Sequence, residues 1–179
     1  TAKEAIGYYT KMNAAFLNTI GLGAKIAGQG DIVREITAYI NFLQGKERAG
    51  IERAVLSNVF ARDLFAEGLF QRFSSLVTQQ DTYFNVFSAL ASDEQKTFYK
   101  NTLSGSAAQT VEKMRKVAFE KVAEGNFNIN SWDWFLASTG RINLLKEVED
   151  KLSNDLNTLA ENMKIKAAAL LTFHTILVV

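Results

Sequence analysis

Apolar residues recur at intervals of three and four along almost the whole chain, which is the spacing of one face of an α-helix. The first such segment covers residues 3–28, and the second covers residues 31–61. We predict that the second segment forms one long helix with a kink at Gly45. At about 1.5 Å per residue such a helix is roughly 45 Å long, so the pattern indicates an elongated bundle. The first segment places these residues on one face: Ile6, Tyr9, Met12, Phe16 and Ile20.

Shorter helical repeats follow, separated by polar or glycine-containing turns. Ser92 and Gln95 have the spacing of a capping box, in which each residue satisfies the backbone N–H of the other. Gly125 is a candidate C′ residue, and Ser131 is a candidate N-cap for the last helix. The predicted helices after the second are residues 69–90, 93–103, 107–124 and 131 to the C-terminus.

The last helix carries an apolar seam with a rhythm close to a heptad, which fits either a helical bundle or a coiled-coil dimer. We therefore predict an all-α fold, an elongated antiparallel bundle of the four-helix-bundle type with a long final helix. The thirteen phenylalanines are explained by core packing, with a dimer surface as the alternative. The seam consists of Leu145, Val148, Leu152, Leu156, Leu159 and Met163.

The chain ends in the apolar stretch AAALLTFHTILVV. It is too short to span a bilayer, which needs about 20 apolar residues. It is either the start of a transmembrane helix or an apolar end buried in the bundle, and the preceding Lys164 and Lys166 favour the first because they resemble an interfacial flank. We accordingly divide the chain into a helical domain, residues 1–165, and an apolar end, residues 166–179.

Composition narrows the function by exclusion. The absence of proline agrees with helix nearly throughout, and the absence of cysteine removes disulfides, thiolate metal sites and cysteine nucleophiles. The single histidine, His174, has no partners for a catalytic triad or a metal site, so we predict no catalysis, no metal and no cofactor. A net charge of +1 argues against nucleic acid as a partner.

One basic run needs a separate interpretation. It alternates with acidic residues along the helix predicted over residues 107–124, so we interpret it as an exposed face crossed by ion pairs. The run comprises Lys113, Arg115, Lys116 and Lys121, and the acids are Glu112, Glu120 and Glu124.

Three groups of residues carry a resemblance to a known family. The first is Lys46, Glu47, Gly50, Glu52, Arg53 and Ala54; the second is Phe60, Phe65, Phe73, Gln80 and Asp81; the third is Trp134, Thr139, Arg141 and Ile142. In this order and spacing they resemble the nitrate- and nitrite-sensing domain of bacterial chemoreceptors, sensor kinases and transcription antiterminators, over roughly residues 8–160. The resemblance implies that the family's domain begins one helix earlier, with a Glu-Arg-Gly motif that supplies an arginine, and we expect that helix to be missing from the sequence given.

The resemblance implies a nitrate or nitrite site between helices, gripped by arginines. Arg141 is the first candidate, with Trp134 and Ser138 at positions i−7 and i−3 on its helix face. Arg53 and Lys46 follow, two turns apart on one face of their helix. The alternatives are ion pairs, of Arg141 with a carboxylate such as Glu147 and of Arg53 with a neighbouring glutamate. We assign Gly50 to close helix approach.

The resulting hypothesis is a periplasmic ligand-sensing domain of a membrane-anchored receptor, either a chemoreceptor or a sensor kinase, that forms a homodimer and signals through its final helix. Two alternatives stay open. The first is a non-catalytic helical dimerisation module without a small ligand. The second is a cytoplasmic nitrate-sensing domain of a transcription antiterminator, in which the chain would continue into an RNA-binding output domain.

Overall fold

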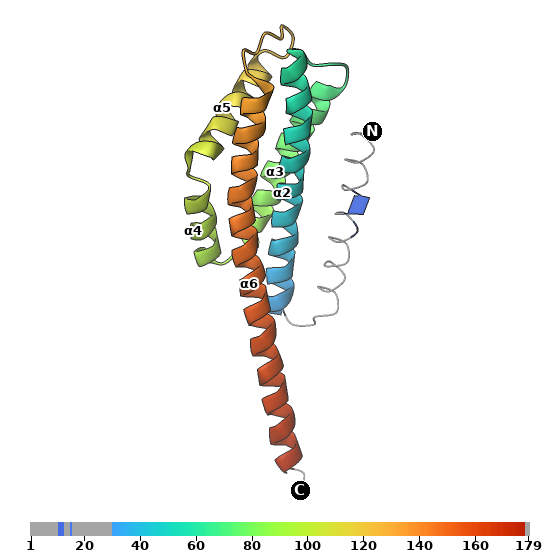
Figure 1. Ribbon diagram of the computed structural model, residues 1–179. Coiled ribbons are helices and arrows are strands. Elements are labelled where there is room, and N and C mark those ends of the chain that lie inside the picture. Colours follow the sequence, from blue (N-terminus) through green and yellow to red (C-terminus); the bar gives the residue numbers. More distant parts are fainter. Residues whose placement is uncertain (1–10, 13–14, 16–29, 178–179) are drawn as a thin grey trace.

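The computed structural model describes residues 11–12, 15 and 30–177 (Figure 1). The helix predicted over residues 3–28 therefore lies almost entirely outside the described residues. The secondary structure of the described part consists of helices, which confirms the all-α prediction. Its helices are α2 (Gly30–Arg62), α3 (Leu69–Leu90), α4 (Asp93–Thr102), α5 (Ser106–Glu120) and α6 (Ser131–Leu177).

The helices form an elongated bundle with antiparallel neighbours (Figure 1). α2 packs against both α3 and α6, while α4 and α5 follow each other along α6 and together make the fourth column of the bundle. α6 is the longest helix, and its C-terminal part extends beyond the other columns (Figure 1). The prediction of a four-helix-bundle type with a long final helix is thus confirmed.

Two glycines let the columns approach each other closely. A Cβ atom on Gly45 would lie 2.7 Å from the Phe84 ring, so α2 and α3 can pack this closely because Gly45 has no side chain. α2 continues through Gly45 as one helix. A Cβ on Gly140 would lie 3.2 Å from Ala107 of α5. Gly50 has nothing within 4 Å of its would-be Cβ, so the prediction that Gly50 permits close approach is wrong and that role belongs to Gly45.

The loop that contains Gly125 connects the end of α5 to the start of α6. α5 ends at Glu120, earlier than predicted, and Gly125 has a φ of 65° in the loop, where its would-be Cβ would meet the Asp63 carbonyl oxygen at 2.4 Å. The N-cap of α6 is Asn130, whose Oδ1 accepts a hydrogen bond of 2.8 Å from the Trp132 backbone N–H. The choice of Ser131 as N-cap is therefore wrong by one residue.

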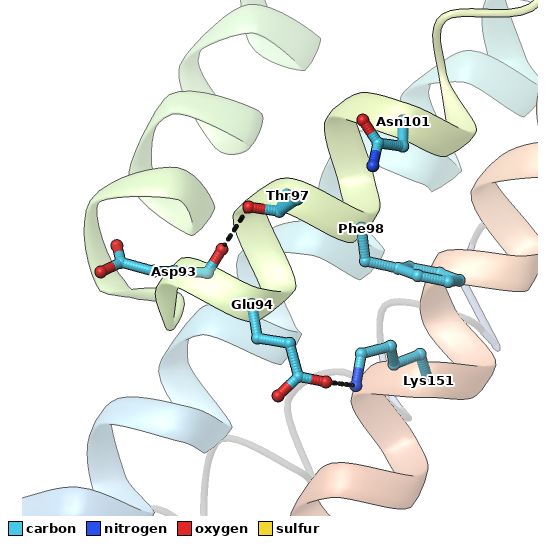
Figure 2. A pocket seen from close by; sticks show the side chains of 6 residues that line it. All are labelled: Asp93, Glu94, Thr97, Phe98, Asn101 and Lys151. Atoms are coloured by element: carbon cyan, nitrogen blue, oxygen red, sulfur yellow. Dashed lines mark hydrogen bonds and ion pairs between the residues drawn. The ribbon is translucent and has the colours of Figure 1, made fainter.

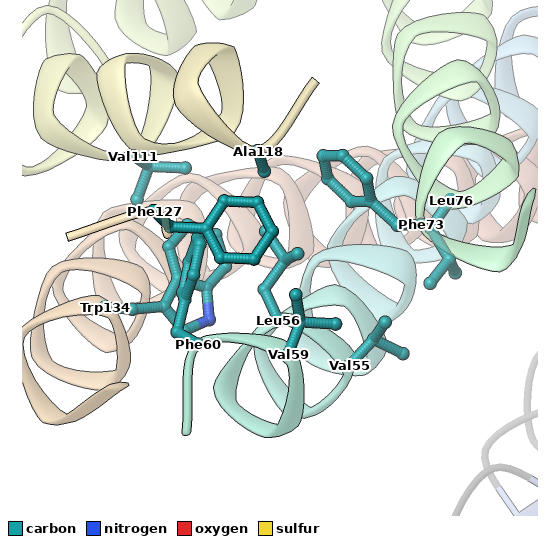
Figure 3. Close-up of a cluster of buried hydrophobic side chains, with 10 residues drawn as sticks. All are labelled: Val55, Leu56, Val59, Phe60, Phe73, Leu76, Val111, Ala118, Phe127 and Trp134. Carbon is teal, nitrogen blue, oxygen red and sulfur yellow. The ribbon is translucent and has the colours of Figure 1, made fainter. Parts of the chain in front are cut away.

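The apolar core is divided into two clusters, one toward each end of the bundle. The cluster near the loop end joins α2, α3, α5 and α6 with Phe127 of the connecting loop (Figure 3). The other lies at the α3–α4 end and includes Leu145, Val148 and Leu152, so half of the apolar seam of α6 is buried within the monomer. The homodimer predicted from this seam stays a prediction.

The predicted capping box at the start of α4 is present and reaches two further helices. Gln95 Oε1 accepts a hydrogen bond of 3.0 Å from the Ser92 N–H, and the Gln95 N–H donates to Ser92 Oγ at 3.2 Å. The same amide donates through Nε2 to Glu35 of α2 at 3.0 Å and to Asp155 of α6 at 3.1 Å. Gln95, only 3% exposed, therefore ties three columns together.

We expect Gln95→Ala to lower the free energy of unfolding by about 2–3 kcal/mol, because hydrogen bonds to two carboxylates and one cap bond are lost together. Urea denaturation followed by circular dichroism measures this change. The exposed Gln79→Ala serves as control and should stay within about 0.5 kcal/mol of the wild type. A Gln95→Ala variant as stable as the control would show that the three-way contact does not stabilise the bundle.

No membrane-spanning segment is found among the described residues of the C-terminal end. Within the described residues, no helix combines the length and the apolar character needed to cross a bilayer. α6 runs through residue 166 without interruption, so the boundary between residues 1–165 and 166–179 coincides with no break in the helix and stays a prediction.

Candidate anion-binding site

A layer of polar side chains separates the two apolar clusters. Along α2 it lies between Ala49 and Val55, and along α6 between Trp134 and Leu145. Burying such groups is unfavourable unless they bond to one another, so their presence inside the bundle demands an explanation. The layer takes one residue from each column, with the exposed fraction in parentheses: Glu52 of α2 (1%), Gln80 of α3 (0%), Arg115 of α5 (4%) and Arg141 of α6 (8%).

Glu52 and Arg115 form a bidentate ion pair in this layer. Arg115 Nε donates to Glu52 Oε1 and Arg115 Nη2 donates to Glu52 Oε2, both at 2.6 Å. Arg115 Nη1 also bonds Glu112 at 2.6 Å, toward the surface. Burial by itself lowers the pKa of Arg115, but the hydrogen bonds and charge of Glu52 outweigh it and the pKa is raised. The charges of Glu52 and Arg115 therefore compensate each other.

Gln80 connects this pair to Arg141. Its Oε1 accepts from Arg115 Nη2 at 2.8 Å and from Arg141 Nη1 at 2.9 Å, while its Nε2 donates to Glu52 Oε2 at 2.9 Å. The second amide hydrogen points to the Leu76 carbonyl at 3.2 Å. One side-chain amide thus bridges a carboxylate and two guanidinium groups.

Arg141 is the group in the layer that lacks a charged partner. Among the described residues no carboxylate lies within 4.0 Å of its guanidinium, and its hydrogen bond goes to the neutral Gln80. Burial, and then the nearby charge of Arg115, lower the pKa of Arg141. An arginine stays protonated near neutral pH nonetheless. The buried layer itself holds two guanidinium groups and one carboxylate, while Glu112 pairs with Arg115 from the surface. Arg141 is thus the buried guanidinium without a carboxylate partner, which favours a bound anion.

Two of the other predicted residues share the inner face of α6 with Arg141. Ser138, 4% exposed, lies one turn before Arg141. Trp134 lies a further turn away, inside the apolar cluster (Figure 3). Its indole N–H donates to the Arg53 carbonyl oxygen at 3.0 Å, and its ring centroid lies 5.7 Å from that of Phe60. Trp134 is thus part of the α2–α6 packing.

The structure does not bring Arg53 and Lys46 to Arg141. Arg53 Nη1 donates to Thr139 Oγ1 at 2.9 Å, and its guanidinium lies 5.0 Å above the Phe135 ring. Thr139 and Arg141 are about 200° apart around α6. The Arg53 guanidinium therefore contacts a different face of α6 from the one that carries Arg141. Lys46 forms an ion pair with Glu149 of α6.

Sequence reasoning missed three members of the layer. Arg115 is buried, so the interpretation of its whole basic run as an exposed face is wrong, although Lys113 and Lys116 are exposed. Glu52 pairs with Arg115 and not with the adjacent Arg53. A signal was present for each: Gln80 stands within an otherwise apolar stripe of its helix, and Arg115 shares a face with Val111 and Ala118.

A second feature of the surface, a shallow depression of about 430 Å³ between α4 and α6, does not suit an anion (Figure 2). Its cation, Lys151, is already paired with Glu94 at 2.8 Å and with Asp155 at 3.1 Å. Asp93 and Glu94 add negative charge to the rim. The buried layer around Arg141 is therefore the better candidate.

Comparisons with known proteins identify the family of this chain. A family model described as nitrate and nitrite sensing matches residues 1–157. A nitrate regulatory protein from Klebsiella oxytoca is 30% identical over 160 residues, which are 89% of this chain and 40% of that protein. The structure of the NasR transcription antiterminator superposes with a TM-score of 0.76 at 30% identity and covers 86% of this chain and 41% of that one.

These comparisons correct three predictions. The membrane-anchored chemoreceptor or sensor kinase and its periplasmic location are wrong, because the relatives are a nitrate regulatory protein and a transcription antiterminator. The exclusion of nucleic acid as a partner is wrong for the same reason. It was drawn from the charge of this chain, which spans about two fifths of each of these relatives and so does not represent their whole surface.

The family resemblance found in the sequence is confirmed over a larger part of the chain than its motifs covered. The match includes the segments that hold Glu52, Gln80, Arg115 and Arg141, all of which lie within residues 1–157. This chain belongs to the nitrate and nitrite sensing family.

Proposed function

We propose that this chain binds nitrate or nitrite at Arg141, in the buried polar layer, and serves as the non-catalytic sensing part of a transcription regulator of the antiterminator type. The observation that carries the proposal is the buried Arg141 guanidinium with a neutral partner. A bound monovalent anion would supply the charged partner that Arg141 lacks among the described residues. Ser138, on the same face, offers a hydroxyl for a second contact.

The chemistry of the anion suits this group. A guanidinium presents several N–H donors in one plane, and nitrate and nitrite present their oxygens in one plane as well. Within the described residues the Arg141 guanidinium donates its side-chain hydrogen bond to the neutral Gln80. A weakly hydrated, singly charged anion also loses less free energy on burial than a compact one.

The relatives support a regulatory output. Both are transcription-related or nitrate-regulatory by name, and this chain matches about two fifths of each. We therefore place the parent protein in the cytoplasm, where transcription takes place, with nucleic acid among the partners of its remaining part.

The layer is also placed to transmit a signal, because its members come from all four columns of the bundle. A ligand shifts a conformational equilibrium only by its differential affinity for the two states. Binding at Arg141 changes the balance of charge at the point where the columns meet, and α6 extends from there beyond the bundle (Figure 1).

The test is isothermal titration of nitrate and nitrite into the purified chain, with chloride and sulfate as control anions. We expect saturable nitrate or nitrite binding that Arg141→Ala weakens at least about 30-fold, since truncating one member of a buried charged contact costs 2 kcal/mol or more. Arg141→Lys should recover only part of the affinity, because a lysine lacks the planar fork.

The matched control is Arg72→Ala, an arginine exposed on α3, which should bind as the wild type does. Circular dichroism establishes that each variant is folded. Undiminished binding by folded Arg141→Ala would place the anion elsewhere, and the absence of nitrate and nitrite binding to the wild type would refute the proposed ligand.

A further inference from the structure

Every hydrogen-bonding position of the Gln80 side chain is occupied, and its oxygen is the atom that faces the cations. Oε1 accepts from Arg115 and from Arg141, while Nε2 donates to Glu52 and to the Leu76 carbonyl. This leaves one orientation of the amide, because a flip would turn N–H donors toward two guanidinium groups. The carbonyl oxygen of Gln80 therefore stands at a place beside Arg141 that an anion's oxygen would favour.

We infer that Gln80 is an internal competitor of the anion: its Oε1 occupies a donor of Arg141 in this structure, and the anion displaces it on binding. This inference rests on the proposed function and deepens it. The Gln80 amide oxygen is neutral, whereas nitrate and nitrite carry the negative charge that is missing next to Arg141. A hydrogen bond between two ionised groups is stronger than one between an ionised and a neutral group. The anion therefore replaces Gln80 Oε1 as the partner of Arg141 when it is present.

Displacement would have a defined structural consequence. Within the described residues, the bond from Arg141 Nη1 to Gln80 Oε1 is the side-chain hydrogen bond that joins α6 to α3. Gln80 keeps its contacts to Arg115 and Glu52 when that bond breaks, so α3 stays linked to α2 and α5. Anion binding thus uncouples α6, the helix that extends from the bundle, from α3 (Figure 1). Gln80 sets both the affinity of the site and the contact that the ligand releases.

The experiment is titration of nitrate and nitrite into the wild-type chain, Gln80→Met and Gln80→Glu, with the neighbouring exposed Gln79→Met as matched control. Methionine keeps the length of the side chain and removes the competing oxygen, so we expect Gln80→Met to bind the anion about three- to tenfold more tightly. A carboxylate at this position neutralises Arg141, so we expect Gln80→Glu to bind at least about tenfold more weakly. Gln79→Met should match the wild type.

The alternatives give opposite results. If the Gln80 amide contacts the anion directly, or only holds Arg141 in place, Gln80→Met binds more weakly than the wild type or equally well, and the inference is overturned. If methionine prevents folding, Gln80→Glu decides, and an affinity equal to that of the wild type overturns the inference. A wild-type chain that binds neither anion refutes the proposed function itself. If the wild type binds tightly and Gln80→Met does not bind more tightly than the wild type, only the competitor role is refuted.

Discussion

Replacing Glu52 by alanine is expected to lower the free energy of unfolding by about 3–5 kcal/mol, the range for breaking one partner out of a buried ion pair. The change removes the carboxylate that pairs with Arg115 at 2.6 Å through two oxygens and also accepts from Gln80. Arg115 and Arg141 would then share the interior with no buried carboxylate between them. Like charges in a low-dielectric interior repel strongly, which adds to the loss of the hydrogen bonds.

Urea denaturation of Glu52→Ala, Arg115→Met and the double variant measures this effect and its coupling. The double variant should be less destabilised than the sum of the single ones, because removing both members of the pair leaves no isolated charge. Glu112→Ala is the matched control, since Glu112 pairs with the same arginine from a side chain that is 62% exposed. We expect it to cost less than about 1 kcal/mol. A loss for Glu52→Ala no larger than this would show that the layer is hydrated in solution.

Replacing Trp134 by alanine is expected to cost about 3–5 kcal/mol, as for other large aromatic side chains removed from a core. Trp134 is fully buried, packs against Phe60, and donates its indole N–H to the Arg53 carbonyl. Trp134→Phe keeps most of the ring and leaves that carbonyl without its donor, so we expect a smaller loss of about 1–2 kcal/mol. The difference between the two variants separates packing from hydrogen bonding.

Thermal and urea unfolding of these variants give the stability, and Trp132→Ala provides the control, because Trp132 is 61% exposed on the same helix. It should remain within about 0.5 kcal/mol of the wild type. Nitrate titration of Trp134→Phe tests the ligand role expected from the sequence. An affinity unchanged within about twofold would assign Trp134 to the packing alone, and a large loss in a stable variant would return it to the site.

A buried polar layer between two apolar clusters is an expensive arrangement for a bundle of this size. Replacement of buried ion pairs by apolar side chains is often neutral or stabilising, so stability alone does not account for Glu52 and Arg115. The pair does hold Gln80 in the orientation that leaves Arg141 with a neutral partner. We interpret the layer as the framework that keeps one guanidinium charged, buried and available to an anion.

The helices could be predicted from the amino-acid sequence, because their signals are local. The spacing of apolar residues placed α2 and α3 to within about one residue of the observed bounds, within the usual uncertainty of helix ends. The Ser92–Gln95 capping box was also evident from a few adjacent residues. The prediction of Gly125 as C′ residue was wrong, because α5 ends at Glu120 and Gly125 lies in the loop after it. The family, too, was recognisable from motifs whose residues are close together in the chain.

The pairing of charges could not be predicted in this way, because a buried ion pair joins residues that are far apart in the chain and meet only in the folded bundle. Glu52 finds Arg115 across 63 positions and not the adjacent Arg53, since neighbours along a helix point to different faces. Arg141 could have paired with Glu147, yet Glu147 is exposed while Arg141 faces the interior and Gln80. The lack of a carboxylate partner that makes Arg141 a candidate anion site is a property of the assembled layer, and no single helix carries it.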